Sequence, residues 1–510
     1  MYKKTLIRKK TYFDSVTLMS LTAKIKQIAG VHHVVIAMAT DMNLDILRKN
    51  GLATAETEAS APNDLAIALE LEDASLEEAV LQAIDDGLKP VKLQSQTQEI
   101  TYKTIHAAAQ ETNSNLVVIS APGEYAAREA MLALRDGLHV MLFSDNISVA
   151  EELSLKTYAR EKGLLVMGPD CGTSIINQVG LCFANAVQSG TIGLVAASGT
   201  GLQEVTVQIH HYGGGISQAI GVGGRDLNEA IGGIMMMEGI KALNQDPQTE
   251  VIVLISKPPH PAVREKIMEL LTTVNKPVVI NFLDDHAQQD ERYHYANELV
   301  DAARLAVSLA YPAARQNTEG NDLTSIPAYG FAEEQKYLRG LYCGGTLCAE
   351  ALSIGRQRLS CKSNVAKKEQ EKLADPFVSV GHTLVDLGDD VFTNGRPHPM
   401  IEPSIRLDRI IAEANDPKTK VILLDFELGF GSHPDPAGIT IPAIQEAQNI
   451  ARRANRDLAF VGYVLGTDQD FQDKAKQIQL LKEWNVLVAD SHADAIRLAV
   501  QITEGGYDGN

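Results

Sequence analysis

Two segments of this 510-residue chain repeat one pattern: a short apolar run, a glycine turn, a threonine, and a helix-like stretch with an early glutamate. The first begins at Gly193 (GLVAASGTGLQE) and the second at Gly340 (GLYCGGTLCAE). Downstream, Asp-Pro steps at Asp246 and Asp416 each precede a Val/Ile/Leu-rich run, and a glycine-arginine landmark lies between in both copies. Landmarks in the same order indicate an internal duplication. The sequence therefore predicts two copies of one domain.

The chain has the strand pattern of an α/β protein. Val/Ile/Leu-rich runs without polar alternation are separated by amphipathic stretches almost throughout, which is typical of βαβ units in a mainly parallel sheet covered by helices on both faces. The runs expected to form strands are residues 34–39, 65–69, 116–120, 140–143, 164–167, 192–196, 251–255, 277–281, 421–425 and 458–464.

The length requires several domains, because a single hydrophobic core stops growing well below 510 residues. The hydrophobic share of 45% against 22% charged residues is ordinary for a globular protein. We expect an N-terminal region at 1–188, a first repeat at 189–315, a polar linker broken by Gly and Pro at 316–336, and a second repeat at 337–505 with an insertion near 355–380.

The net charge of −19 excludes two classes of partner. Nucleic acids and anionic membrane surfaces bind basic proteins, so neither is expected here. A small anionic metabolite must instead be held locally, by backbone N–H groups or by single Arg and Lys side chains. That requirement directs attention to the starts of helices.

The cysteines and the N-terminus point to a cytoplasmic protein. The five cysteines include no C-x-x-C pair, which argues against a disulfide framework and a zinc knuckle. The N-terminus is basic without the apolar run of a signal peptide, and no stretch of 18 apolar residues occurs.

The two glycine turns are the strongest candidates for anion binding. Each lies where a strand gives way to a helix, so that unpaired backbone N–H groups and the positive end of the helix dipole face outward. A tight turn with an ordinary Ser or Thr N-cap is the structural alternative. The candidate residues are Ser198, Gly199, Thr200 and Gly201 in the first turn and Gly344, Gly345 and Thr346 in the second.

A second glycine-rich segment, Gly-Val-Gly-Gly224-Arg225-Asp226, follows a short apolar run. It is expected at the carboxyl end of a strand, where open α/β sheets bind ligands. Arg225 would clamp a phosphate or carboxylate and Asp226 would orient it, whereas a turn with a surface ion pair is an equally good interpretation.

The loop after residues 164–167 is expected to form one wall of the site. It contains Asp170, Cys171, Gly172 and Thr173. Cys171 would be a nucleophile only beside a base that lowers its pKa, and a buried small residue is the more economical interpretation.

The last domain carries a comparable set of loops. The segments Asn394-Gly395-Arg396 and Gly429-Phe-Gly431 mix polar, basic and glycine residues after predicted strands, where functional residues concentrate. Asp389, Asp390 and a histidine match no standard metal-ligand spacing, so no metal is assigned. Each loop alone is also explained as a structural turn, but together they suggest a second half-site.

Several long motifs resemble the FdrA family, which is similar to the α subunit of succinyl-CoA synthetase. They are GPDCGTSIINQVGLCFANAVQSGTIGLVAASGTGLQEV, GGGISQAIGVGGRDL, DLGDDVFTNGRPHPMIEP and LDFELGFGSHPDP. The resemblance implies a Rossmann-like CoA-binding-type domain followed by two flavodoxin-like ligase-type domains. It also implies that the two glycine-started helices face one site and hold one phosphate from both sides.

Two features of the synthetases are missing from this sequence. The early glycine-rich CoA fingerprint is replaced by Tyr12-Phe13-Asp14, so no cofactor is assigned, although CoA is the one that the family would use. The Gly-His-Ala-Gly phosphohistidine loop is replaced by a segment containing His294 without glycines, and His382 follows Gly381 in the other repeat.

The resemblance implies that the chain acts with partner subunits, and as a homo-oligomer, in ureide breakdown. The expected reaction transfers a carbamoyl or acyl group between carbamoyl phosphate and a small acceptor such as oxamate. An acyl-CoA ligase that uses a nucleotide and a non-catalytic metabolite-binding subunit are the alternatives.

Overall fold

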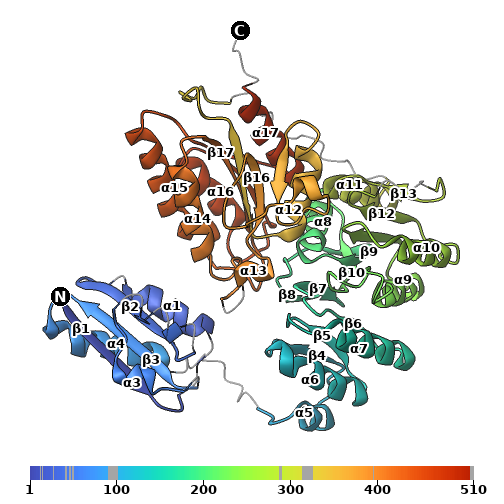
Figure 1. Cartoon of the computed structure of the whole chain (residues 1–510). Helices are drawn as coiled ribbons and strands as arrows, with labels where there is room; N and C mark the ends of the chain where they lie inside the picture. The colour runs from blue at the N-terminus through green and yellow to red at the C-terminus, as the bar shows by residue number, and fades with distance from the viewer. Residues whose placement is uncertain are drawn as a thin grey trace. The chain divides into compact units, whose positions relative to one another are not determined.

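The computed structural model describes residues 1–11, 13, 15–26, 28–40, 43–44, 47–48, 51–61, 63–89, 101–285, 290–312, 326–393 and 396–505. The chain forms two compact units. The first is Met1–Thr101 with Gly395–Pro397, and the second is Tyr102–Asn394 with His398–Asn510. Figure 1 labels their helices and strands.

The first unit is a small antiparallel α/β domain. Its elements are β1 (Tyr2–Arg8), α1 (Ser15–Lys26), β2 (Val31–Met38), α3 (Ala55–Glu58), β3 (Leu65–Leu71), a 3-10 turn (Ala74–Leu76) and α4 (Glu77–Leu88). The sheet order is β1-β3-β2, and both pairings are antiparallel. The parallel βαβ arrangement expected for these strands is therefore wrong. Apolar clusters cover both faces of β3, so even an antiparallel strand shows no alternation here.

The second unit begins with a three-stranded parallel sheet in the order β4-β5-β6. Its elements are α5 (Ile105–Glu111), β4 (Leu116–Ile119), α6 (Gly123–Arg135), β5 (His139–Leu142), α7 (Val149–Lys162) and β6 (Val166–Met167). The region predicted as 1–188 is thus divided between two units, and only its later part has the expected parallel sheet.

A seven-stranded sheet follows in the order β13-β12-β11-β9-β10-β7-β8. Its elements are β7 (Thr173–Ile176), β8 (Val179–Cys182), β9 (Ser189–Ala197), α8 (Gly199–His211), β10 (Ile216–Gly221), α9 (Ile234–Gln245), β11 (Val251–Ser256), α10 (Pro261–Leu271), β12 (Val278–Phe282), β13 (His294–Tyr295) and α11 (Leu299–Ala310). The strands from β9 onward are parallel, whereas the hairpin β7–β8 adds to the edge antiparallel.

A six-stranded parallel sheet completes the unit in the order β15-β16-β14-β17-β18-β19. Its elements are β14 (Tyr337–Tyr342), α12 (Gly345–Gly355), β15 (Cys361–Ser363), a 3-10 turn (Glu369–Glu371), β16 (His382–Asp386), α13 (Asp390–Thr393), α14 (Ser404–Asn415), β17 (Thr419–Glu427), α15 (Pro436–Arg453), β18 (Ala459–Leu465), α16 (Lys474–Glu483), β19 (Val486–Ala489) and α17 (His492–Glu504).

The two large sheets share a central strand order. In the first, β10 lies on one side of β9, and β11, β12 and β13 follow in order on the other. In the second, β16 lies on one side of β14, with the short strand β15 outside it, and β17, β18 and β19 follow in order on the other. This is what two copies of one domain require, so the topology agrees with the duplication inferred from the sequence. Each predicted strand run also overlaps an observed strand.

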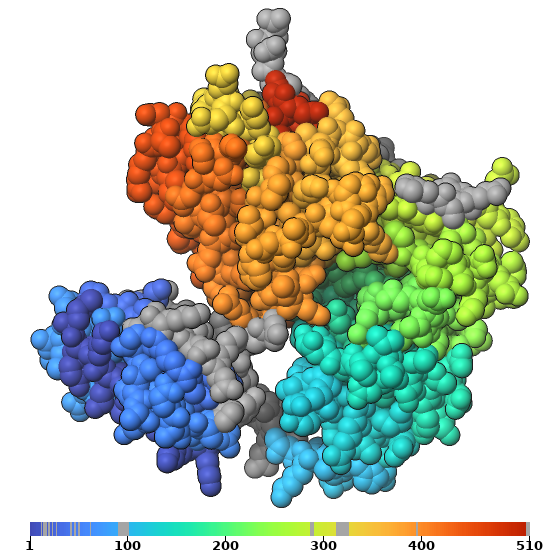
Figure 2. All heavy atoms as spheres, viewed as in Figure 1, coloured from blue at the N-terminus to red at the C-terminus, as the bar shows by residue number. Residues whose placement is uncertain are grey.

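One apolar core joins the two copies. It gathers inward-facing residues of both large sheets with those of α8, α11, α12 and α17. The outer faces have separate cores, under α9 and α10 in the first copy and under α14, α15 and α16 in the second. The two copies therefore pack through their inner helices, and Figure 2 shows their surfaces in direct contact (green and orange). Among the described residues, no helix is both long enough and apolar enough to cross a bilayer.

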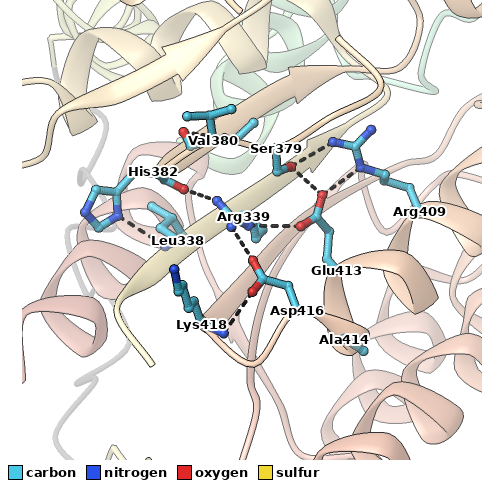
Figure 3. A network of polar contacts seen from close by, with 12 residues as sticks. Leu338, Arg339, Ser379, Val380, His382, Arg409, Glu413, Ala414, Asp416 and Lys418 are labelled. Atoms are coloured by element: carbon cyan, nitrogen blue, oxygen red, sulfur yellow. Dashed lines mark hydrogen bonds and ion pairs between the residues drawn. The ribbon is translucent and has the colours of Figure 1, made fainter. Parts of the chain in front are cut away.

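A buried ionic network fixes the start of β14 in the second copy (Figure 3). The Arg339 side chain is buried and pairs with Glu413 (Nε–Oε2 2.9 Å) and Asp416 (Nη2–Oδ2 2.7 Å). Glu413 also accepts a hydrogen bond from Arg409 Nε at 2.7 Å. One carboxylate therefore neutralises two largely buried guanidinium groups, and the strand is fastened to α14.

We predict that Glu413→Gln destabilises the protein. The substitution keeps the shape of the side chain but leaves Arg339 and Arg409 short of their shared counter-charge, and breaking a buried ion pair from one side costs about 3 kcal/mol or more. Thermal unfolding should show a Tm lower by roughly 3–6 °C. Glu446→Gln, which removes an exposed partner of Arg453, is the control and should leave the Tm unchanged. Equal Tm values for the two variants would refute the assigned role.

Candidate functional site

The structure brings the two glycine turns together. Ser198 caps α8 by accepting a hydrogen bond from Gly201 N at 2.9 Å, as the N-cap interpretation expects. Its Oγ also lies 2.6 Å from Thr346 Oγ1 in the first turn of α12. Thr346 N in turn donates to Thr200 Oγ1 at 3.3 Å. Two helix starts that are far apart in the sequence therefore lie side by side, as Figure 1 shows for α8 and α12.

The paired helix starts, Ser198–Gly201 and Gly344–Thr346, are called the paired starts below. They concentrate hydrogen-bond donors. Ser198 and Thr346 are both buried, which fixes the two helix ends against each other. Within the described part of the chain, the backbone N–H groups of Gly199, Thr200 and Gly345 have no protein acceptor. Each helix start carries about half a positive charge from its dipole. The arrangement is therefore suited to an anion that accepts hydrogen bonds from both helices.

Lys257 adds a full positive charge beside this pair. It follows β11 directly, and the register that aligns Ser256 with Ala197 places it next to Ser198. Within the described residues its ammonium group has no hydrogen bond or ion pair. The sequence contains a signal for Lys257 in the motif VIVLISKPP, because a lysine directly after a buried strand lies at the carboxyl edge of the sheet. The sequence pattern alone did not lead to a prediction of Lys257 as a site residue.

Asp386 is a buried carboxyl group beside the second turn. It ends β16, and a Cβ added to Gly345 would lie 2.5 Å from its Oδ2. Its Oδ1 accepts a hydrogen bond from Gly388 N at 2.9 Å. Burial raises the pKa of Asp386 to about 7, although Lys257 opposes the shift. This carboxyl group therefore changes charge near neutral pH beside the proposed anion.

Cys343, Asp425 and Glu427 form a buried cluster behind the second turn. Asp425 accepts hydrogen bonds from the N–H groups of Cys343 and Gly344, and Arg406 Nη1 lies 3.3 Å from its Oδ1. Burial, followed by the charge of Asp425, raises the pKa of Glu427 well above its usual range. The three side chains offer one ligand atom each within 4.8 Å. Because Asp425 is already satisfied by amides and a guanidinium, the cluster fits a shared proton better than a metal.

Arg225 lies where the sequence placed it, after β10, but Asp226 does not orient it. Arg225 Nη2 pairs with the buried Glu152 at 3.0 Å and donates to Ile147 O at 2.7 Å. Asp226 is fully buried and instead pairs with Lys156 at 2.8 Å. The prediction for Asp226 is therefore wrong, because a fully buried lysine needs a counter-ion more than the half-buried Arg225 does.

A cavity of about 450 Å³ opens beside Arg225. Gly224 and Asp170 line it, together with Asp145 and Asp390. Burial, followed by the charges of Asp390 and Asp145, raises the pKa of Asp170 to about 6. Three carboxyl groups around one arginine make this cavity a poor host for a highly charged phosphate.

The Cys171–Thr173 loop lies beside the first turn. A Cβ on Gly199 would be 3.8 Å from Gly172 Cα, so this loop adjoins the start of α8. The Cys171 thiol is buried, which raises its pKa to about 12. It therefore lacks the thiolate character of a nucleophile. Thr173 is buried at the start of β7.

The candidate site loops of the second copy, 394–396 and 429–431, are not brought to the paired starts by any contact described above. Asn394 and Gly395 lie outside the described residues, and Arg396 is exposed. A Cβ on Gly431 would approach Cys182 O and Phe183 Cδ1 at 3.0 and 2.9 Å. Gly431 thus allows close packing on the β8 hairpin.

Neither candidate phosphohistidine lies at the paired starts. His294 pairs with Val279 of β12 and lies on the edge strand β13, so that β12 and β11 separate it from β9 and the first glycine turn. His382 opens β16, and its Nδ1 accepts a hydrogen bond from Leu338 N at 3.2 Å. His382 therefore lies at the amino end of its strand, whereas the second glycine turn follows the carboxyl end of β14.

The early glutamates of the repeat secure the two helices one turn below the site. Glu204 of α8 accepts a hydrogen bond from Tyr463 of β18 at 2.6 Å. Glu350 of α12 lies 2.6 Å from His492 and accepts from Leu299 N at 2.8 Å. Each glutamate thus contacts the other copy. Their identical positions in the repeat were a signal for this role.

Comparison with known families gives three matches. Residues 1–104 match the AllF heavy metal-associated domain, residues 187–283 match a CoA binding domain, and residues 341–502 match CoA-ligase. The CoA-binding match thus lies on the segment predicted as the first ligase-type domain, and not on residues 1–188.

Relatives agree with these matches. Uncharacterized protein YahF of Escherichia coli K12 is 46% identical over 503 residues, which cover 97% of this chain and 98% of YahF. The succinate–CoA ligase [ADP-forming] subunit alpha of Aquifex aeolicus is 28% identical over 205 residues, 39% of this chain and 66% of that subunit. The structure of dinucleotide-forming acetyl-coenzyme A synthetase 1 from Ca. Korarchaeum cryptofilum covers 81% of this chain and 90% of its own, at 14% identity and a TM-score of 0.34, too low to support an argument.

Two observations bear on the groups that these family names imply. The five cysteines all lie beyond residue 170, so residues 1–104 offer no thiolate to a soft heavy metal. The acidic cavity at Arg225 does not suit the several phosphates of CoA. No step is derived through either group.

We predict that anion binding at the paired starts weakens as the pH rises through 7. Asp386 is largely neutral below its pKa of about 7 and negatively charged above it, where it repels the anion. Sulfate is a suitable probe because its own charge is constant between pH 6 and 8. Its affinity, measured by calorimetry, should fall by up to roughly tenfold over this range.

Asp386→Asn should remove most of this pH dependence, because the amide does not ionise. Asp408→Asn, a change at an exposed site on α14, is the matched control and should retain it. Sulfate affinity that falls equally in the Asp386 variant would show that another group titrates.

Proposed function

We propose that this chain holds the phosphate of a carbamoyl or acyl phosphate at its paired helix starts. The chain belongs to the FdrA family together with YahF, and it has the CoA-binding and CoA-ligase domains of acyl-CoA synthetases. At the level of class, the protein is acyl-CoA-synthetase-like. The finer proposal is that it is a subunit that transfers a carbamoyl group between carbamoyl phosphate and a small acceptor such as oxamate.

The 2.6 Å approach of Ser198 Oγ to Thr346 Oγ1 carries the proposal. It supports a site in which N–H groups from two helices point to one position, with Lys257 beside them. Donors fixed in advance stabilise charge without reorganising during the reaction. A phosphate leaving group gains negative charge as it departs, so this arrangement favours its departure.

In the proposed reaction, the acceptor nitrogen attacks the carbonyl carbon of carbamoyl phosphate. A carbon–nitrogen bond forms, the bond from that carbon to the phosphate oxygen breaks, and inorganic phosphate leaves with the electron pair. The nitrogen gives up one proton to the phosphate or to water. The chain's own contribution is to bind and orient the phosphate and to stabilise its charge. Partner subunits, which the family resemblance implies, would complete the site.

The positions of His294 and His382 favour direct transfer over a phosphohistidine cycle, because two strands separate His294 from the first glycine turn and His382 lies at the amino end of β16. A nucleotide-driven acyl-CoA ligase is the second candidate. The CoA-ligase match over residues 341–502 and the similarity to succinate–CoA ligase subunits favour it. The two candidates differ in the substrate they need, because only the ligase consumes a nucleotide and CoA.

We predict that the purified protein with its co-purifying partners releases phosphate from carbamoyl phosphate and consumes oxamate at equal rates. Colorimetric phosphate release and mass spectrometry of the carbamoylated product provide the measurements. Turnover that requires nucleotide and CoA, with labelling of His294 by nucleotide phosphate, would instead establish the ligase.

We predict that Thr346→Val reduces this activity by roughly tenfold or more, mainly through a higher KM for the phosphate donor. Valine has the shape of threonine but lacks the hydroxyl that contacts Ser198, so the fold should be retained. Thr272→Val, which removes an exposed hydroxyl at the end of α10, should leave both kcat and KM unchanged. Full activity in the Thr346 variant would exclude the paired starts as the phosphate site.

A further inference from the structure

A second cavity, of about 210 Å³, is lined by Lys257 and by residues of α12. Lys257 and Leu283 enter it from the carboxyl ends of β11 and β12, and Leu352 enters it from α12. Ala349, which also lines the cavity, lies one turn after Thr346 on α12, and the register of β11 places Lys257 next to Ser198. The cavity is therefore an extension of the phosphate site along α12.

The far wall comes from the segment after β15, which was expected only as an insertion. Val365 adds to the apolar floor, and Lys367 supplies a second ammonium group. Lys367 Nζ donates to Pro258 O at 3.1 Å, on the loop that begins with Lys257. Residues from both copies thus build one cavity with an apolar floor and a basic wall.

Two of the cations in this wall have no carboxylate partner among the described residues. Arg356 is neutralised by Asp284 at 2.8 Å and by Glu371 at 3.2 Å. Lys257 and Lys367 form no ion pair. Burial lowers the pKa of Lys367, and the nearby charge of Lys257 lowers it further. The chain has a net charge of −19, so two neighbouring ammonium groups without ion pairs make this wall locally basic in an otherwise acidic protein.

The size of the cavity limits the ligand. Pockets for drug-sized molecules and cofactors have volumes of about 300–1,000 Å³. A cavity of 210 Å³ is smaller than these and accommodates an organic acid of a few heavy atoms, not a nucleotide. An apolar floor under two ammonium groups is complementary to a short carbon chain that ends in a carboxylate.

We infer that this cavity binds the carboxylate of a small organic acid, through Lys257 and Lys367, next to the phosphate held at the paired starts. Identifying that acid as the acceptor rests on the proposed function, whereas the anion site itself does not. The arrangement sets the acceptor and the phosphate donor on either side of Lys257, which is the proximity that group transfer requires.

The full-length protein tests this inference through separate binding measurements with oxamate and with sulfate. Lys367 lines the cavity, whereas Lys257 lies beside both the cavity and Ser198. Lys367→Met should therefore weaken oxamate about tenfold and leave sulfate unchanged. Lys257→Met should weaken both ligands. Lys241→Met removes a lysine that is exposed and paired with Glu238 on α9, so it should change neither affinity.

Val365→Phe provides an independent test, because a larger side chain on the floor fills the cavity without changing its charge. It should weaken oxamate and leave sulfate binding and the Tm close to those of the parent protein. Oxamate binding that is unaffected in both the Lys367 and the Val365 variants, or that is absent in the parent up to millimolar concentrations, would overturn the inference.

The outcome also separates this inference from the proposed function. Oxamate binding that depends on Lys367, in a protein that transfers no carbamoyl group, would support the anion site and reject the acceptor role. Carbamoyl transfer with a KM for oxamate that is insensitive to Lys367→Met would support the proposed function and reject the cavity as the acceptor site.

Discussion

The single core shared by the two copies is the constraint on which the site depends. Inner helices from both sheets pack together there, and buried hydrogen bonds fix their register. Glu204 reaches Tyr463 of the second copy, while Glu350 reaches Leu299 N of the first. Burying carboxyl groups costs free energy unless they find partners, so only one relative placement of α8 and α12 satisfies both. The contact between Ser198 and Thr346 follows from that placement.

The site must attract an anion although the chain carries a large net negative charge. Long-range fields repel anions from a protein with a net charge of −19, so attraction must be local. Helix dipoles, backbone N–H groups and Lys257 provide it within a few ångströms. Asp386 works against them when it is ionised. Occupancy of the site is therefore coupled to a carboxyl group whose protonation changes near neutral pH.

The sequence was sufficient for the parts of the fold that depend on local pattern. It located the central strands and the glycine turns, and its repeats indicated the duplication that the shared central strand order agrees with. It was wrong about the strands of residues 1–101, because a centrally buried antiparallel strand such as β3 looks like a parallel one. It missed Lys257, Lys367 and the partner of Asp226, since these roles depend on side chains that meet only after the two copies pack.

The shared core has a consequence for how the chain can be divided. The two copies look like separable modules, each with its own sheet and repeat. Yet the inner helices of either copy would present an apolar surface to water if the other were removed, and Glu204 and Glu350 would each lose a partner across that surface. A chain cut between the copies would not yield two independent soluble domains. The duplicated halves therefore fold as one unit, in which the helices of each half cover the inner face of the other.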